Sequence, residues 1–276
     1  MALATLTINS STLVAAQWSD GIGFAANAEL AVIGGATDIV TAVDQNGTNI
    51  ESFVVGAQFS GNIGTAAAPL RFTASDGSSA RKSSANSENF VRFLGGNTIY
   101  LNPGASGIDN LLCGGNLLNA NQTANTVVYL TIDGTSYTAQ SSAVATNVEV
   151  WTGRYADAAS SSNTFTSFVV YGGSAFIQRG GTTLEVISGT VDYNGTSASL
   201  TNVYVRGGLF RHISGSITNV YGLGGTTDFT KLSGAVTVTN YYSYAGHTRK
   251  GKVANQGGLL TITNDILYEG AAPDEP

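Results

Sequence analysis

The sequence lacks several features on which common functional sites depend. Cys113 is the only cysteine, so neither an intrachain disulfide nor a cysteine metal cluster can form. It lies in an apolar run before Gly114 and Gly115, which is typical of a buried structural thiol. No stretch approaches the roughly 18 consecutive apolar residues that span a membrane. We therefore expect a chain without a membrane segment, a redox site or a cofactor.

Charge is also scarce. Charged residues make up 11% of the chain and the net charge is −6, so no basic stripe predicts nucleic-acid binding. The densest basic runs, residues 81–82 and 249–252, are typical of solvated loops. Hydrophobic residues reach 42% and occur in alternating runs, which argues against disorder. Ser, Thr, Asn and Gln must then make the polar surface, as on many extracellular and virion β proteins.

Glycine is abundant, with 35 copies, and it closes a phrase that recurs along the chain. Residues 201–208 and 218–225 are the clearest copies: a threonine, an apolar strand-like run and a glycine pair. The copies begin at threonines 146, 166, 183, 201, 218, 239 and 263, and subtraction gives spacings of 20, 17, 18, 17, 21 and 24 residues.

This period predicts the architecture. A repeat near 20 residues is too short for a helix pair or a propeller blade, but it fits one coil of a parallel β-solenoid. Gly207 and Gly224 are expected to turn corresponding corners with positive φ, whereas Gly77, in a serine-rich loop, is expected to tolerate substitution. The predicted fold class is all-β: a parallel β-helix of 17–24 residues per coil with a β-rich N-terminal region.

The repeat also suggests three regions. We assign residues 1–87 to a β-rich capping or attachment region, 88–268 to the parallel β-helix, and 269–276 to an acidic C-terminal tail. A looser copy near Thr48 leaves open whether the first region belongs to the solenoid. Two prolines prevent the tail from continuing a strand ladder, so it is interpreted as a cap or contact arm, with fraying as the alternative.

Three aspartates are the main candidates for chemistry. Asp157, Asp192 and Asp228 follow their threonines by 11, 9 and 10 residues, a spacing compatible with one shared face. Two coils separate neighbours by about 9.6 Å, the outer edge of the roughly 6.5–9.5 Å typical of an inverting glycosidase pair. Structural, solvent-facing aspartates are the alternative that we favour. His247 is expected in a turn, and His212 as a packed or surface strand residue.

Aromatic residues allow two interpretations. Trp18, Trp151 and the 12 tyrosines offer material for a sugar-binding platform. Tyr204 and Tyr221 occupy matching repeat positions, which favours an aromatic ladder along successive coils.

The Thr/Asn/Gly-rich coils resemble right-handed parallel β-helix proteins of the pectate-lyase-like superfamily, which includes polysaccharide lyases, polygalacturonases and bacteriophage tailspikes. The resemblance covers residues 88–270. The galacturonases carry Gly-His-Gly and Arg-x-Lys; residues 246–250 here read Gly-His-Thr-Arg-Lys, without the second glycine and with arginine and lysine adjacent. This departure favours a non-enzymatic member with no catalytic, cofactor-binding or metal site.

From this resemblance we expect a structural protein of a bacteriophage virion: a capsid decoration, cement, vertex or fibre component. It implies a homotrimer that contacts a major capsid or tail protein, made in the host cytoplasm without a signal peptide. The alternative is a tailspike-type protein that binds or depolymerises a cell-surface polysaccharide, with Asp192, Asp228 and His247 as the residues to test. An ice-binding solenoid is a third reading, which the unequal coil lengths disfavour.

Overall fold

The computed structural model describes residues 3–6, 9–77, 90–115, 117–119, 126–140, 143–159, 161–249 and 259–268. The chain is all-β, with 65% strand and 1% helix, and forms a parallel β-solenoid of about 10 turns, which confirms the predicted fold class. None of the helical structure in these ranges is long and apolar enough to cross a membrane. The chain divides into two compact units, Met1–Thr146 and Asn147–Pro276, which we describe separately as unit 1 and unit 2.

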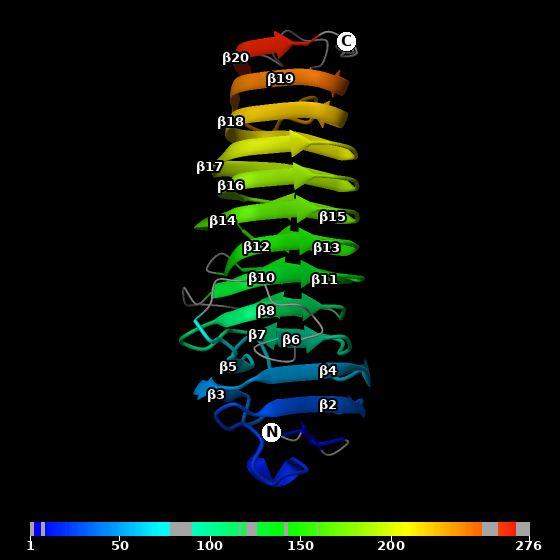
Figure 1. Ribbon diagram of the computed structural model, residues 1–276, viewed down its shortest axis with the longest axis vertical. Coiled ribbons are helices and arrows are strands. Elements are labelled where there is room, and N and C mark those ends of the chain that lie inside the picture. The colour runs from blue at the N-terminus through cyan, green and yellow to red at the C-terminus, as the bar shows by residue number, and fades with distance from the viewer. Residues whose placement is uncertain are drawn as a thin grey trace. The chain divides into compact units, whose positions relative to one another are not determined.

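Unit 1 is built from short parallel strands and one turn of 3-10 helix. They are β1 (Ala4–Thr5), η1 (Ala15–Gln17), β2 (Glu29–Gly35), β3 (Asp44–Asn49), β4 (Ser52–Phe59), β5 (Arg71–Thr73), β6 (Phe90–Phe93), β7 (Ile99–Leu101), β8 (Ile108–Cys113), β9 (Leu117–Asn119), β10 (Thr126–Ile132) and β11 (Thr135–Ala139). One parallel ladder runs β1–β2–β4–β6–β8–β10, a second runs β7–β9–β11, and β3 pairs with β5 (Figure 1).

The parallel ladder of unit 1 crosses the expected boundary at residue 87. Ser52 of β4 lies in register with Phe90 of β6, so strands before residue 87 pair with strands after it. The region 1–87 is thus continuous with the solenoid ladder, and its capping or attachment role stays a prediction. The tail at 269–276 and the basic residues 81–82 and 250–252 lie outside the described residues.

Aromatic rings fill the interior of unit 1. Phe53 contacts Phe72 and Phe93 edge-on, with ring centroids 5.4 and 6.1 Å apart, and all three are fully buried. Phe24 lies against Phe53 and meets the buried Trp18 edge-on. Each such ring contributes about 1.5–3 kcal/mol through burial. Residues close to the N-terminus thereby take part in the same core as β4 and β6.

Unit 2 has longer strands. They are β12 (Val144–Val150, which begins just before the unit boundary), β13 (Gly153–Asp157), β14 (Ser161–Val170), β15 (Ser174–Ile177), β16 (Arg179–Val186), β17 (Thr190–Val205), β18 (Leu209–Asp228), β19 (Val236–Arg249) and β20 (Leu260–Leu267). Its first ladder runs β12–β14–β16–β17–β18–β19–β20 and its second runs β13–β15–β17–β18.

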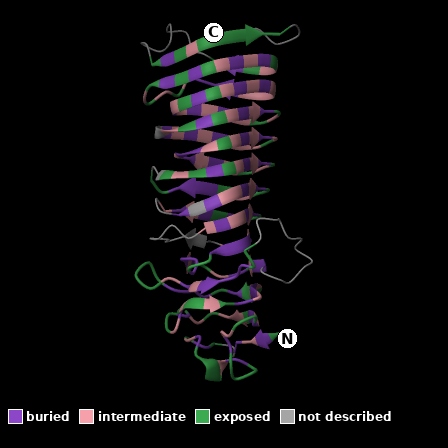
Figure 2. Ribbon diagram, turned by 60° about the vertical axis from the view of Figure 1, so that its left-hand side comes forward, coloured by how far each residue is buried: buried purple, intermediate pink, exposed green. Residues whose placement is uncertain are grey.

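The alternation of buried and exposed positions along these strands explains why they stack (Figure 2). On the first ladder, one inward column consists of Val148, Phe168, Leu184, Val203, Val220 and Tyr241. All of these side chains are buried. Successive coils thus bury one another's apolar rows, as expected for a solenoid.

Strand register corrects one copy of the predicted repeat. Ser167 pairs with Thr183, and Thr183 pairs with Asn202. The equivalent of Thr166 and Thr201 is therefore Thr182, not Thr183. Two adjacent threonines gave the sequence pattern no means of choosing between them.

The corner glycines also differ from the prediction. Gly208 (φ +79°) and Gly225 (φ +28°) have positive φ, whereas Gly207 and Gly224 do not. A side chain at Gly207 is instead blocked by the carbonyl oxygen of Ile187, one coil earlier. Gly77 has φ +76°, so a side chain there would be strained despite open space around it, contrary to the expected tolerance.

The positive-φ glycines of unit 2 form a column, which we call the glycine column. Its members share the corner between the first and second ladders: Gly153, Gly173, Gly189, Gly208, Gly225 and Gly246. A Cβ on each of the last five would touch the carbonyl oxygen of the member before it, at 2.5 Å for Gly208 and for Gly225. The coils approach so closely at this corner that only glycine fits.

Candidate functional site

An asparagine ladder follows the outward side of the first ladder of unit 2. Asn219 donates its Nδ2–H to Oδ1 of Asn202 at 2.9 Å, Asn240 donates to Asn219 at 2.8 Å, and Asn264 donates to Asn240 at 2.7 Å. Strand register places the four amides in successive coils. The ladder thus joins coils by side-chain hydrogen bonds added to those of the backbone.

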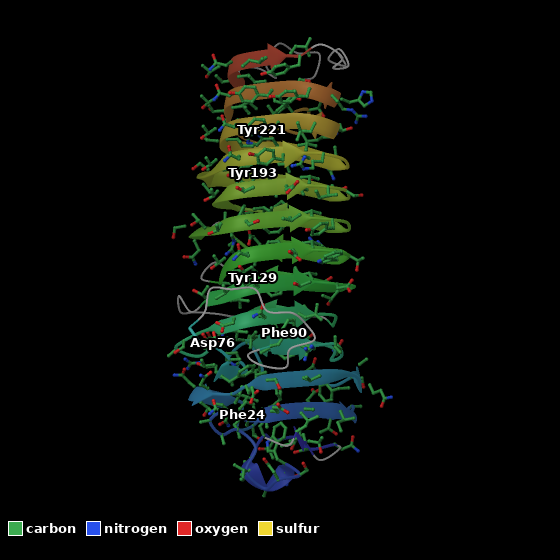
Figure 3. All side chains as sticks on the ribbon, in the orientation of Figure 1. Phe24, Asp76, Phe90, Tyr129, Tyr193 and Tyr221 are labelled. Atoms are coloured by element: carbon green, nitrogen blue, oxygen red, sulfur yellow. The ribbon has the colours of Figure 1, made fainter. Side chains whose placement is uncertain are left out.

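A tyrosine ladder lies two residues further along the same strands. The rings of Tyr204 and Tyr221 stack at 4.7 Å with planes 7° apart, and Tyr221 stacks on Tyr242 at 5.0 Å and 9° (Figure 3). Partial burial raises the pKa of Tyr221, and its neighbours Tyr204 and Tyr242 raise it further. The predicted aromatic ladder is confirmed for these residues. Because stacking occupies the ring faces, the ladder presents edges and hydroxyl groups outward, unlike a platform for sugar rings.

Two exposed aromatic pairs flank this ladder. Trp151 stacks on Tyr171 at 4.4 Å, and its Nε1–H donates to Glu149 at 3.0 Å. Tyr244 stacks on Tyr268 at 4.1 Å. The four rings are 37–46% exposed. They leave apolar surface accessible beside the asparagine and tyrosine ladders.

The second ladder of unit 2 carries a charged column on its outward side. Asp192 is in register with Arg211, and Asp228 with Arg249. The hydrogen bond from Thr226 N–H to the Gly208 carbonyl extends this register, so that Asp228 follows Arg211 in the next coil. Asp192 and Asp228 thus share a column two coils apart, as the spacing predicted.

An arginine separates these two carboxylates, and this changes their chemistry. Nε of Arg211 lies 2.7 Å from Oδ1 of Asp192 in an ion pair that lacks hydrogen-bond alignment. Asp228 is buried, and its Oδ1 accepts the backbone N–H of Thr230 at 2.7 Å. The arrangement stabilises ionised carboxylates, whereas a general acid needs a carboxyl group that retains its proton.

Asp157 lies away from this column. Ala156, not Asp157, leads through Phe176 to Asp192 in strand register, so Asp157 points to the opposite side of its strand. There it forms a buried ion pair with Arg179, whose Nη2 lies 2.6 Å from Oδ1. Tyr155 and Arg179 Nε donate to the same oxygen at 2.8 Å, while the Gln178 N–H donates to Oδ2. The expectation that three aspartates share one solvent-facing side is wrong for Asp157.

The two histidines have different fates. His212 is fully buried among Tyr193, Phe210 and Phe229, which confirms a packed strand residue. Burial lowers its pKa to about 3, with the backbone of Gly215 and Ser214 opposing the shift. His247 is exposed and lies on β19, opposite Thr226, so the predicted turn is wrong. The turn is at Gly246, one residue earlier (φ +91°).

A shallow hollow of about 330 Å³ opens beside the charged column. Arg154, Ser174 and Thr190 line one side of it, and Phe176, Asp192 and Arg211 the other. These residues belong to four successive strands of the second ladder, β13, β15, β17 and β18. The hollow combines two guanidinium groups, two hydroxyl groups and one partly buried aromatic ring.

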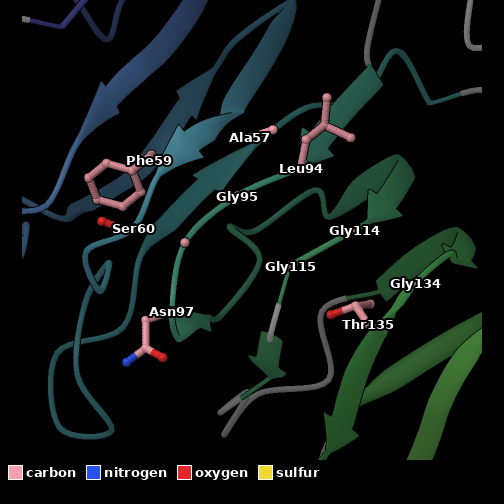
Figure 4. A pocket seen from close by; sticks show the side chains of 11 residues that line it. Ala57, Phe59, Ser60, Leu94, Gly95, Asn97, Gly114, Gly115, Gly134 and Thr135 are labelled. Carbon is pink, nitrogen blue, oxygen red and sulfur yellow. The ribbon is translucent and has the colours of Figure 1, made fainter.

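Unit 1 contains a second hollow, of about 430 Å³, at a corner rich in glycine (Figure 4). Gly95, Gly96, Gly114, Gly115 and Gly134 contribute backbone to its lining. Asn97, Ser60 and Thr135 add polar side chains, and Leu94 and Phe59 add apolar ones. The hollow exists because the turns that surround it have few side chains.

Two ionisable groups in unit 1 complete the survey. Burial raises the pKa of the Cys113 thiol, as expected for a structural cysteine. Asp109 was not singled out by its sequence context. Burial also raises the pKa of its carboxyl group, which accepts the backbone N–H of Asp76 at 2.9 Å. Within the described ranges, no cluster of three or more His, Cys, Asp or Glu side chains is placed to hold a metal ion.

Comparison with known proteins adds no family. No family model, no curated protein and no solved structure matches the chain. The parallel β-solenoid therefore rests on the strand pairing described above.

Proposed function

We propose that the protein is a non-enzymatic structural component of a bacteriophage virion, of the capsid decoration, cement, vertex or fibre type. The observation that carries this proposal is the investment of polar side chains in contacts between coils. The asparagine ladder, the tyrosine ladder and the Asp157–Arg179 pair all join successive coils of unit 2. Such contacts favour a rigid scaffold over a site that must bind and release a substrate.

The same contacts occupy the groups from which an enzyme would draw. Asp192 is paired with Arg211, Asp157 with Arg179, and His212 is enclosed by aromatic rings. The homotrimer, the capsid or tail partners and the location on a virion remain parts of this proposal, and they rest on the resemblance to phage β-helices.

Immunogold electron microscopy tests the proposal. An antibody raised against the full chain should label intact, purified phage particles at regular positions, and native mass spectrometry of the free chain should show three times 28.3 kDa. Absence of the chain from particles that are otherwise complete would overturn the virion assignment. A monomeric mass would overturn the trimer alone.

A second function, binding of a cell-surface polysaccharide, is favoured by the hollow beside the charged column. Arg154 and Arg211 supply hydrogen-bond donors there, Ser174 and Thr190 supply hydroxyl groups, and Phe176 supplies an aromatic ring. Sugar sites use this combination of polar groups around an apolar surface.

Purified capsular polysaccharide or lipopolysaccharide tests this second function. Binding should be retained in the full chain and lost in Arg154→Ala, with no change in the size of the polysaccharide. Cleavage products that disappear in the Asp192→Asn, Asp228→Asn double variant would instead show a depolymerase. Failure of every surface polysaccharide of the host to bind would remove this candidate function.

A further inference from the structure

The hollow in unit 1 has a feature that its fold does not require. Thr135, at the start of β11, is 7% exposed, and its Oγ1 is buried without a hydrogen-bond partner. A buried hydroxyl group without a partner costs about 1–3 kcal/mol, and valine would fill the same volume without that cost. Thr135 lines the hollow, and its hydroxyl points toward the middle (Figure 4).

Strand register explains the open space in front of Thr135. Leu117 pairs with both Ile99 and Tyr137, so positions two residues earlier correspond: Asn97, Gly115 and Thr135. Glycine in the middle coil leaves a gap between the amide of Asn97 and the hydroxyl of Thr135. Asn97 is held in place, because its Nδ2–H donates to Asn62 Oδ1 at 3.1 Å.

The backbone of the hollow limits what can bind. Its N–H groups donate to carbonyl oxygens of the preceding turn at Leu94, Gly96, Asn97, Gly114 and Gly115. An extended peptide that adds to a sheet needs backbone N–H donors as well as acceptors. With these donors already engaged, the backbone mainly offers acceptors, so a ligand must bring its own donors.

Charge and size narrow the ligand class further. The residues that line the hollow carry no charged side chain, which disfavours an ionic ligand. Leu94 is 41% exposed and supplies an apolar edge. A volume of about 430 Å³ falls at the lower end of typical small-molecule sites. A compact, uncharged ligand with many hydroxyl groups meets all three conditions.

We propose that this hollow binds a neutral saccharide, one or two sugar residues long, with Thr135 Oγ1 as a direct hydrogen-bond partner. The site lies wholly in unit 1 and is separate from the arginine-lined hollow in unit 2. It does not depend on the virion assignment, because a structural protein and a receptor-binding protein can each carry it.

Saturation-transfer NMR on the full chain tests the proposal. The probes are neutral disaccharides of glucose, galactose, mannose and N-acetylglucosamine, with glucuronate and an uncharged hexapeptide for comparison. We expect at least one neutral disaccharide to receive saturation from the wild-type chain. Thr135→Val should lower its affinity about tenfold or more.

A second variant and a matched control separate binding from folding. Gly114 tolerates a Cβ, whose nearest neighbours would lie 3.5–3.6 Å away, so Gly114→Ala should fold and also weaken binding by narrowing the hollow. Thr138→Val lies on the same strand outside the hollow and should bind as wild type does.

Three results would overturn the proposal. One is the absence of any neutral disaccharide signal at roughly 10 mM. Another is equal binding by wild type, Thr135→Val and Gly114→Ala. The last is a signal from the hexapeptide or glucuronate alone, which would assign the hollow to a different ligand class.

Discussion

The two units use the same parallel coils but stabilise them differently. Unit 1 relies on a cluster of large rings, with Phe53, Phe72 and Phe93 in edge-on contact across short strands. Unit 2 relies on repetition, with asparagine, tyrosine and glycine each recurring at one position in coil after coil. A solenoid can therefore be held by an irregular core or by regular columns within a single chain.

The difference has a physical origin in how each contact propagates. An aromatic cluster tolerates varied coil shapes, because rings fill whatever space the turns leave. A hydrogen-bonded or stacked column requires the same position in each coil, since a shift of one residue moves a side chain to the other face. Unit 2 should accordingly be sensitive at its column positions, and unit 1 in its core.

The largest expected effect comes from breaking the glycine column of unit 2. Gly208→Ala forces a Cβ against the Gly189 carbonyl at 2.5 Å and places alanine at φ +79°. Left-handed backbone costs roughly 1–2 kcal/mol and overpacking about 1–3 kcal/mol, so unfolding free energy should fall by roughly 2–5 kcal/mol in a chemical denaturation curve.

Gly34→Ala in unit 1 is the matched control. Its Cβ would meet only Gln58, at an ordinary 3.6 Å, without positive φ. Its unfolding free energy should remain within about 0.5 kcal/mol of wild type. Equal losses at Gly208 and Gly34 would refute the close approach of coils in unit 2.

An intermediate effect should depend on pH and arise from His212 in unit 2. Its pKa is about 3 when folded and 6.5 in the reference state, so the unfolded chain binds a proton at higher pH than the folded chain. The stability contributed by neutral His212 is present above pH 6.5 and is lost as pH falls toward 3, by up to about 1.4 kcal/mol per pH unit.

Melting temperatures from pH 7 to pH 4 for wild type and His212→Leu check this prediction. The variant should lose less stability than wild type over that range, because it lacks the titrating group. The difference between the two curves removes the contribution of carboxylates common to both. Parallel curves would show that His212 is accessible to protons in the folded chain.

The smallest expected effect compares an amide in each unit. Asn219→Ala removes two hydrogen bonds of the asparagine ladder, and Asn62→Ala removes two in unit 1, one to Asp38 and one from Asn97. The unit 2 bonds are partly buried and the unit 1 bonds exposed, so water replaces only the latter well. We expect losses of about 1–2 kcal/mol for Asn219→Ala and under about 0.5 kcal/mol for Asn62→Ala.

Hydrogen–deuterium exchange assigns these losses to positions in the chain. Faster exchange in β17, β18 and β19 should accompany Asn219→Ala, and exchange near β4 should change little in Asn62→Ala. A larger loss for Asn62 than for Asn219 would mean that the repeated amides do not stabilise the coils.

The sequence predicted the features that repetition records. The solenoid, its coil length and the alignment of Tyr204 with Tyr221 all follow from residues that recur at a fixed spacing. It erred by one residue where neighbours are chemically alike, at Thr182 and Thr183 and at Gly207 and Gly208. Spacing fixes a repeat only to within such pairs, whereas strand register separates them.

Features without a periodic signature were beyond the sequence. Asp157 was counted with Asp192 because their spacings differ by only two residues, but a strand has a period of two and Asp157 faces the other way. The unpartnered hydroxyl of Thr135 depends on the absence of a side chain at Gly115 in another coil. Such a hollow is a relation between distant residues, and no single stretch of sequence announces it.

The asparagine ladder has a consequence for how the length of such a chain can change. Its rungs are 17, 21 and 24 residues apart, yet each amide meets the next, because loops absorb the differences. Excising residues 203–219 would bring Asn202 directly before Asn240 and leave every rung occupied. A cut of any other size would turn inward side chains outward. The gene can thus lengthen or shorten this unit only in whole coils, each adding or removing about 4.8 Å of height.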